Sequence, residues 1–347
     1  MEGGAGSAGT RPAAVGTPGA SSGATDAAAD EAAIETRELR KAYGRIVALD
    51  GLTMTVPRGE VFGFLGPNGA GKTTAVKLLL GLSRPTAGDG RVLGAPLGDV
   101  GSRRRIGYLP ELFRYQGWMS AREVLGLHCE LARIPASGRK REIDDALELV
   151  GLAARADDQT ETFSKGMQQR LGLGVALLGK PELIVLDEPT SALDPIGRQD
   201  VRAIIASLRE RGTTVFLNSH LLTEVERVCD RVAIVDHGRV VAQLRMADLS
   251  HERGVRVRTG DIDRALAIAA SFGTSRKDGR WLEVAGIAEE SVPGLVRALV
   301  AAGIDVHEVA PARQTLEERF MALLGGDAPA GAATGEPPPT APVGPGR

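Results

Sequence analysis

Short apolar runs rich in Val, Ile and Leu alternate with helical patterns along most of the chain. Apolar runs that predict strands occupy residues 46–56, 61–65, 104–109, 183–186, 214–217 and 231–235. Helical patterns dominate from 120 to about 176. This alternation is typical of a largely parallel sheet covered by helices. The pattern therefore predicts an α/β fold that contains a helical insert at about 112–176.

The same pattern predicts how the chain is divided. Residues 1–33 and 325–347 are dominated by small and polar residues without apolar periodicity, which predicts two disordered tails. We expect a first domain at 34–245, with a hairpin turn at 236–239, and a small α+β unit at 246–324. Strands of that unit are predicted at 255–259, 281–284 and 304–309, and its last helix begins after Thr315. Ser120 and Glu123 predict a capping box at the start of the helical insert.

Composition and charge exclude several classes of protein. Of the 347 residues, 43% are hydrophobic and 25% are charged, as in ordinary globular proteins. The 42 basic and 44 acidic residues nearly balance, so we expect no nucleic acid partner. No apolar stretch approaches the ~20 residues that span a bilayer. Cys129 and Cys229 lie far apart in apolar patterns, which predicts reduced core thiols.

A glycine-rich motif follows the strand predicted at 61–65 and precedes a helical pattern that runs to residue 80. It fits G-x-x-x-x-G-K-[ST], in which backbone amides surround a polyphosphate and the lysine contacts its β- and γ-phosphates. The hydroxyl group that follows the lysine can ligate Mg²⁺. A chance glycine-rich loop is the alternative, and a dinucleotide fingerprint is disfavoured because position 74 is Thr. The residues expected to bind nucleotide are Gly66, Pro67, Asn68, Gly69, Ala70, Gly71, Lys72, Thr73 and Thr74, with Thr73 also a metal ligand.

Two adjacent carboxylates follow the strand predicted at 183–186. Ligands of α/β sheets bind at the carboxyl ends of the strands. Asp187 is therefore expected to hold Mg²⁺, directly or through water. Glu188 is expected to orient and deprotonate the water that attacks the γ-phosphate. An acidic turn before Pro189 with a purely structural role is the alternative.

With these motifs in this order, residues 34–243 resemble the ATPase subunits of ABC transporters. The stretch Phe-Ser-Lys-Gly-Met-Gln-Gln-Arg at 163–170 stands where the family has its signature, 23 residues before the metal aspartate (187 − 164). The resemblance implies that Ser164 and Gly166 contact the γ-phosphate bound to the opposite protomer. Three neighbouring residues depart from the commonest form of the signature, but the phosphate-facing Ser and Gly are retained.

Three single positions also match the family, and a fourth departs from it. Tyr43 matches the aromatic residue that stacks on adenine, and Asp194 lies in the loop that crosses between protomers. His220 matches the histidine that senses the γ-phosphate. For Tyr43 and His220, a packing or capping role is the alternative. At Glu111 the family usually has Gln; a carboxylate can accept a contact in the Mg²⁺ shell but cannot donate one.

The resemblance implies an ATPase, with ATP and Mg²⁺ as cofactors, that drives membrane transport. Two cassettes, identical or different, would enclose two ATP molecules and act on a separate membrane permease from the cytoplasmic side of the cell membrane, as peripheral subunits. Glu111, the signature variant and the carboxyl-terminal extension resemble the drug, antibiotic and sodium exporter branch. The permease is expected to dock around 111–118 and the helical insert that follows. There Phe113, Tyr115 and Trp118 are either contact anchors or aromatic residues buried in the insert.

Two other functions share the same nucleotide chemistry. Soluble ABC ATPases that act on ribosomes or nucleic acid usually carry two cassettes or a long coiled-coil insertion. This sequence has one phosphate-binding motif and no heptad run. A regulatory module that binds nucleotide without turnover is disfavoured by the presence of both Glu188 and His220. The sequence therefore favours an exporter ATPase and leaves its substrate open.

Overall fold

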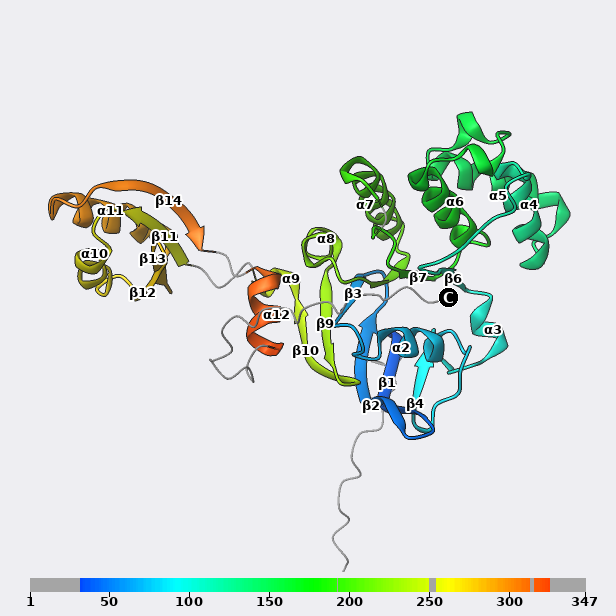
Figure 1. The fold of residues 1–347 in the computed structure, drawn as a ribbon, viewed down its shortest axis with the longest axis horizontal. Helices are drawn as coiled ribbons and strands as arrows, with labels where there is room; N and C mark the ends of the chain where they lie inside the picture. The colour runs from blue at the N-terminus through cyan, green and yellow to red at the C-terminus, as the bar shows by residue number, and fades with distance from the viewer. Residues whose placement is uncertain (1–31, 192, 250–253, 313–314, 325–347) are drawn as a thin grey trace, which may run out of the picture.

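The computed structural model describes residues 32–191, 193–249, 254–312 and 315–324 (Figure 1). The tails expected at 1–33 and 325–347 lie outside these ranges, apart from residues 32 and 33, which begin strand β1 (Ala32–Tyr43). Within the described ranges, no helix combines the length and the apolar character that a membrane span requires.

A six-stranded sheet lies at the centre of the fold and confirms the predicted α/β class. Its order is β10-β9-β3-β8-β7-β6, and every pair is parallel except the hairpin β9–β10. The predicted hairpin turn is present, because Asp236 pairs with Arg239. The strands are β3 (Val61–Leu65), β6 (Ile106–Leu109), β7 (Leu183–Asp187), β8 (Thr214–Asn218), β9 (Arg231–Asp236) and β10 (Arg239–Arg245).

The central sheet separates two hydrophobic cores. Alternate side chains of β3, β7 and β8 point to opposite faces, and these three strands are buried along their whole length. One face packs against helices α7 (Pro195–Glu210) and α8 (Leu222–Val228) and against the helical insert. The other face, with Phe62 stacked on Phe216 at 6.0 Å, packs against α2 (Lys72–Leu79) and a second sheet.

The second sheet is antiparallel and was only partly predicted. Its order is β2-β1-β4-β5, formed by β1, β2 (Ile46–Pro57), β4 (Ala87–Val92) and β5 (Ala95–Pro96), and short helix α3 (Val100–Arg103) follows it. Of these four strands, only β2 is predicted by the sequence pattern. Strand β4 contains two glycines, which usually interrupt strands. At Gly88 the backbone approaches β1 so closely that a Cβ atom would lie 2.1 Å from the carbonyl oxygen of Glu38.

The helical insert forms a lobe at the edge of the central sheet (Figure 1). It contains α4 (Ala121–Leu131), α5 (Ala136–Leu149) and α6 (Lys165–Leu177). The predicted capping box is confirmed: the Ser120 side chain accepts from the backbone N–H of Glu123, whose side chain accepts from that of Ser120. Buried Cys129 is a free thiol, as is Cys229 near α8, and burial raises the pKa of both.

A small α+β unit follows the central sheet in sequence. It alternates β11 (Gly254–Thr259), α10 (Ile262–Ala269), β12 (Thr274–Asp278), β13 (Trp281–Ala285), α11 (Val292–Ala301) and β14 (Val306–Ala312). Its antiparallel sheet has the order β12-β13-β11-β14, and α10 and α11 supply helical side chains to its separate core. Strand β12 was not predicted because its sequence, Thr-Ser-Arg-Lys-Asp, is polar throughout, which an edge strand tolerates.

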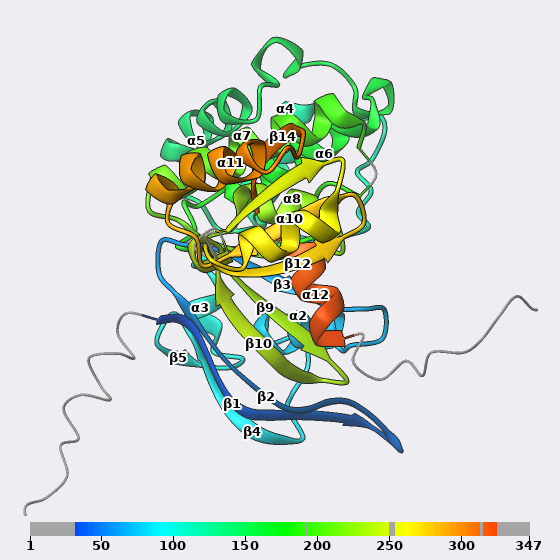
Figure 2. The same ribbon diagram turned by 90° about the vertical axis from the view of Figure 1, so that its left-hand side faces the viewer.

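The expected unit at 246–324 is divided differently in the structure. Helix α9 (Met246–Leu249) continues from β10, and α12 (Leu316–Leu324) lies beside β10 in both views (Figure 1, Figure 2). Leu316 is fully buried in the core that contains the insert helices and α8. The last helix therefore packs on the first domain, and the small α+β unit is inserted in the chain between α9 and α12.

Candidate nucleotide site

The loop between β3 and α2 has a conformation that requires glycine at several positions. Gly69 and Gly71 have positive φ angles of 86° and 96°. Residues other than glycine rarely adopt such backbone angles. A Cβ atom on Gly71 would lie 2.3 Å from the carbonyl oxygen of Ala48 in β2. A Cβ atom on Gly66 would lie 2.3 Å from the carbonyl oxygen of Val235 in β9. Strands on both sides therefore fix the loop that leads into the amino end of α2.

Lys72 is the first residue of α2 and is nearly buried. Its Nζ atom donates hydrogen bonds to the carbonyl oxygens of Gly66 at 2.7 Å and Pro67 at 3.1 Å. Burial lowers the pKa of Lys72, and the negative charges of Glu188 and Asp187 oppose that shift. The ammonium group therefore sits inside the loop, within electrostatic reach of both carboxylates.

The carboxyl ends of β3, β7 and β8 meet at one edge of the central sheet. Asn218 at the end of β8 is aligned with Asp187 of β7 on one side and with Phe64 of β3 on the other. Its Nδ2 atom donates a hydrogen bond of 2.5 Å to Oδ1 of Asp187. Burial raises the pKa of Asp187; the hydrogen bond from Asn218 lowers it, and the charge of Glu111 raises it further. Asp187 is thus fixed in place and lies within electrostatic reach of Glu111.

Glu188 has a left-handed backbone conformation, with φ at 53°. Such a conformation costs a residue with a side chain about 1–3 kcal/mol and is held only where its surroundings impose it. Here the backbone N–H of Glu188 donates to the carbonyl oxygen of Asn218, 2.9 Å away. The turn after β7 therefore directs the Glu188 side chain differently from a continued strand.

The Glu188 carboxylate lies next to His220. Its Oε2 atom is 2.8 Å from Nδ1 of His220, but no aligned hydrogen bond satisfies this buried oxygen. Burial is the main cause of the raised pKa of Glu188; the contact with His220 and the charge of Lys72 lower it, whereas Asp187 raises it. The His220 side chain is 54% exposed, so its ring reaches the surface of the site.

The oxygen atoms at this edge of the sheet fit a metal ion that binds together with the phosphates of a nucleotide. Among the described residues, no group of three His, Cys, Asp or Glu side chains could hold a metal by itself. Mg²⁺ in nucleotide sites takes one or two protein oxygens and completes its shell with phosphates and water. The Asp187 carboxylate and the Thr73 hydroxyl supply that number of donors, and the unsatisfied Oε2 atom of Glu188 can accept a hydrogen bond from a bound water. Glu111 is exposed at the same edge, beyond the end of β6.

The residues expected from the family signature lie elsewhere in the chain's own fold. Ser164 caps α6, and its Oγ accepts a hydrogen bond of 3.3 Å from the backbone N–H of Met167. Gly166 lies in the first turn of α6, which belongs to the insert lobe and is separate from α2 (Figure 1). Asp194 caps α7 and accepts from the backbone N–H of Gly197 at 2.7 Å. One copy of the chain therefore does not bring Ser164 and Gly166 to Lys72.

Tyr43 lies at the hairpin of β1 and β2, which also supplies Ala48 to the loop. The ring is 48% exposed, and Nζ of Lys41 lies 4.9 Å from its centroid. An exposed ring with a cation on one face is available for stacking. Its exposure contrasts with the buried aromatic side chains of β3 and β8.

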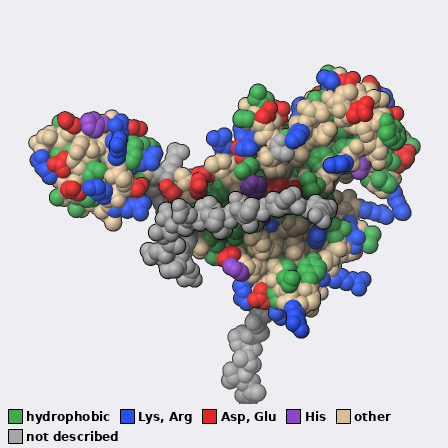
Figure 3. Space-filling model, viewed as in Figure 1, with side chains coloured by type: hydrophobic (Ala, Val, Ile, Leu, Met, Phe, Trp, Pro, Cys, Tyr) green, Lys and Arg blue, Asp and Glu red, His purple; other side chains and the backbone are tan. Residues whose placement is uncertain are grey.

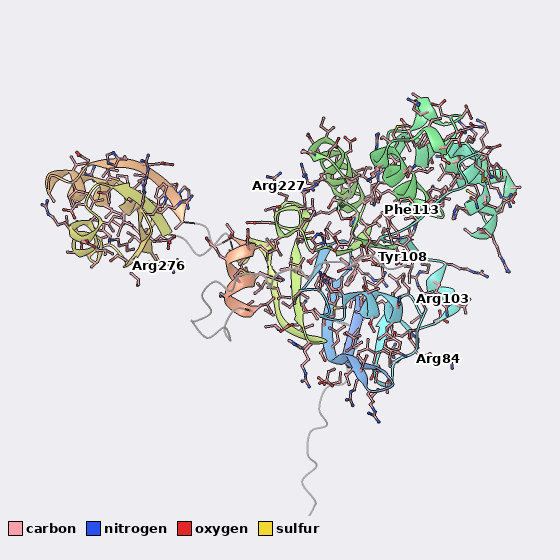
Figure 4. All side chains as sticks on the ribbon, in the orientation of Figure 1. Arg84, Arg103, Tyr108, Phe113, Arg227 and Arg276 are labelled. Carbon is pink, nitrogen blue, oxygen red and sulfur yellow. The ribbon has the colours of Figure 1, made fainter. Side chains whose placement is uncertain are left out.

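The aromatic residues of the insert separate into two groups. Phe113, labelled in Figure 4, and Tyr115 are partly buried against the insert core with ring centroids 5.4 Å apart, whereas Trp118 is 69% exposed. Acidic, basic and apolar side chains are interspersed over the described part of the face in Figure 3. Trp118 is therefore the one aromatic residue of the three with a ring largely open to another molecule.

Sequence reasoning missed Asn218, which aligns Asp187 and accepts from the Glu188 backbone. A signal was present, because a polar residue ends an apolar strand directly before Ser219 and His220. Asn218 and Ser219 are almost completely buried, at 2% and 1% exposure. Two buried polar residues at a strand end indicate a site rather than a loop.

Comparisons with known proteins identify the family. Residues 49–191 match the family described as ABC transporter. An ABC transporter ATP-binding protein of Nostoc sp. (strain PCC 7120) is 41% identical over 304 residues, which cover 83% of this chain and 88% of that protein. The daunorubicin resistance ATP-binding protein DrrA3 of Streptomyces coeruleorubidus is 38% identical over 307 residues, covering 86% and 97%. A solved ATP-binding subunit of an ABC transporter aligns with a TM-score of 0.56 and 30% identity, covering 62% of this chain and 91% of that structure. With its phosphate-binding loop and paired carboxylates at one sheet edge, this chain belongs to the ATP-binding, ATP-hydrolysing subunits of ABC transporters.

Proposed function

We propose that this chain powers export across a membrane, in partnership with a separate permease and a second cassette. The gathering of Lys72, Asp187, Glu188 and His220 at one edge of the central sheet carries the proposal. Similarity to a daunorubicin resistance protein supports export as the direction. The chain would act on the cytoplasmic side of the membrane, bound to its permease.

The proposed chemistry assigns each residue a role in transferring the γ-phosphoryl group to water. Lys72 and the loop amides hold the β- and γ-phosphates, where charge stabilisation is the main contribution a protein makes. Glu188 accepts the proton of the attacking water, and its raised pKa brings it closer to the range of an effective base. His220 orients Glu188 across the 2.8 Å contact and reaches the γ-phosphate.

The same proposal assigns the metal shell. Thr73, Asp187 and Glu111 would hold Mg²⁺, which bridges phosphate oxygens and neutralises part of their charge. Without a cation, the carboxylates of Glu111, Asp187 and Glu188 repel one another. The negative charge of Glu111 raises the pKa of Asp187, and that of Asp187 raises the pKa of Glu188. Asn218 keeps the Asp187 carboxylate in a fixed orientation.

A second cassette completes the proposed site. The amino end of α6 presents unpaired backbone N–H groups next to Ser164, and such helix ends bind phosphate. Because α6 and α2 lie apart in one chain, Ser164 and Gly166 would serve the ATP bound to the partner copy (Figure 1). Asp194, at the amino end of α7, would lie in the loop between the two protomers.

The proposed function is tested by recovering the partners of a trapped cassette. Tagged Glu188→Gln protein is incubated with Mg²⁺ and ATP and purified from detergent-solubilised membranes. The proposal expects a protein with several membrane spans to co-purify, and to do so less when ATP is omitted. Recovery with ribosomes or nucleic acid alone would contradict export while leaving the ATP site intact. Lys72→Met protein, which should bind ATP much more weakly, is the control for capture that does not depend on nucleotide and is tested at an ATP concentration too low to fill its site.

The proposed adenine contact predicts the behaviour of two Tyr43 variants. Tyr43→Ala should raise the dissociation constant of ATP by about 5- to 100-fold, since stacking on a base contributes about 1–3 kcal/mol. Tyr43→Phe keeps the ring and should bind ATP like the parent. Titration with a fluorescent ATP analogue measures both. Equal binding by the Ala variant and the parent would show that the ring does not contact the nucleotide.

A further inference from the structure

We infer that helix α12 positions His220 through helix α8, an inference that rests on the proposed role of His220 at the γ-phosphate. His220 is the second residue after β8, and α8 begins at Leu222. The backbone N–H of Leu221 donates a hydrogen bond to Oγ of Ser219, 3.1 Å away. The connection from β8 to α8 is therefore short and internally bonded, so a displacement of α8 moves His220 relative to Glu188.

Helix α8 depends on its neighbours for its position. It has seven residues, and helices shorter than about 12 residues are marginal by themselves. Against β3, Val225 fills the space left by Gly63, where a Cβ atom would lie 2.8 Å from its Cγ1. Against α7, the largely buried Glu224 carboxylate pairs with Arg202 at 2.6 Å. The third neighbour is α12.

Helix α12 is anchored in the core of the first domain. Leu316 is fully buried in the cluster that includes Val225 and Cys229, and Phe320 packs against the same cluster. The start of α12 is fixed by reciprocal bonds: the backbone N–H of Thr315 donates to Oε2 of Glu318 at 3.0 Å, and that of Glu318 to Oγ1 of Thr315 at 3.1 Å. This capping box places the buried leucine at the first position of the helix.

The small α+β unit is joined to the first domain on both sides of this contact. The chain leaves the first domain after α9, forms the small sheet and returns as α12. Because the chain passes from the small unit into the first turn of α12, a displacement of the small unit is expected to move α12, and with it α8 and His220.

The expected result of Leu316→Ala is a lower turnover number with nearly unchanged ATP affinity. We expect kcat to fall about tenfold, equivalent to about 1.4 kcal/mol in activation free energy, and KM for ATP to stay within about twofold. The cavity loosens α8, whereas this chain's residues proposed to hold its own ATP lie on the β3–α2 loop, α2 and β1. Leu316→Met preserves the volume and should restore kcat. Leu299→Ala, an equally buried leucine in the small unit, should leave kcat near the parent value.

A double-mutant cycle with His220→Ala, measured in single-turnover assays of the full chain, tests the route of the effect. If α12 acts through His220, Leu316→Ala should have no further effect in the His220→Ala background. The inference would be overturned if the double variant lost the product of the two single rate losses. It would also be overturned if Leu316→Ala were fully active while His220→Ala was impaired. Both results would leave the proposed role of His220 intact. Full turnover by His220→Ala would instead contradict the proposed role of His220. Equal losses of kcat in Leu316→Ala and Leu299→Ala would show that general destabilisation causes the effect, which would also overturn the inference.

Discussion

Glu188→Gln is expected to lower ATP turnover by about 10²- to 10⁴-fold while ATP binding stays intact. The amide has the shape of the carboxylate but cannot take the proton from the attacking water. Binding is preserved because Lys72 and the glycine loop are unchanged. Phosphate release at saturating ATP measures turnover, and titration of a fluorescent ATP analogue measures affinity. Glu182→Gln is the matched control, since Glu182 precedes the opposite end of β7 and pairs with Arg58 and Arg105.

The Glu188→Gln variant also shows whether the buried Glu188 carboxylate lowers the stability of the folded protein. Burial raises the pKa of Glu188 above its unfolded value of 4.5. The native state therefore holds this proton more tightly, and the group's contribution to stability falls as pH rises from 4.5 through the raised pKa. At neutral pH the parent bears the full cost of a buried carboxylate, which Gln removes. Melting temperatures of the nucleotide-free proteins should be higher for Glu188→Gln at neutral pH, and the difference should shrink on acidification.

A turnover near that of the parent would remove Glu188 from the proposed mechanism, whatever the melting temperatures. If Glu188→Gln melts well below the parent at neutral pH, the ionised Glu188 carboxylate does not destabilise the folded protein. The two measurements thus address the catalytic base and the buried charge independently. A strained, partly unsatisfied group kept at a sheet edge is typical of a site in which function opposes stability.

The elements that sequence predicted best are those whose local pattern agrees with the whole fold. Strands β3, β7 and β8 are apolar throughout because helices and a second sheet cover both faces. The glycine loop could be predicted because its shape needs glycine at fixed spacing and a lysine at the start of a helix. Gly71 illustrates the point, since the approach of Ala48 excludes any side chain there.

The features that sequence did not predict depend on contacts between distant segments. The left-handed turn at Glu188 is fixed by Asn218, which lies 30 residues further along the chain (218 − 188). The partner of α12 could not be identified from its own amphipathic pattern, which fits either domain. Burial of Leu316 and packing of Phe320 assign it to the first. Strands β4 and β12 have glycine-rich or charged sequences that neighbouring strands stabilise.

Lys72→Met should weaken ATP binding by about 10- to 100-fold and reduce hydrolysis to background. A hydrogen bond to a charged group contributes about 1.5–3 kcal/mol, and the variant loses the only cation proposed to lie inside the loop. Methionine keeps most of the side-chain volume, so Ala75 and Val76 of α2 should remain packed. Lys77→Met, one turn further along α2 with an exposed side chain, is the matched control and should bind ATP within about threefold of the parent.

The Lys72 ammonium also bonds the loop to itself in the absence of nucleotide, which gives the variant a second expected property. Two carbonyl oxygens, those of Gly66 and Pro67, lose their donor. We therefore expect faster amide hydrogen exchange in the loop of nucleotide-free Lys72→Met than in the parent. Weak binding with unchanged exchange would assign the loss of affinity to charge alone. Unchanged binding would contradict the proposed phosphate contact, because no other lysine or arginine is proposed to reach the β- and γ-phosphates from this loop.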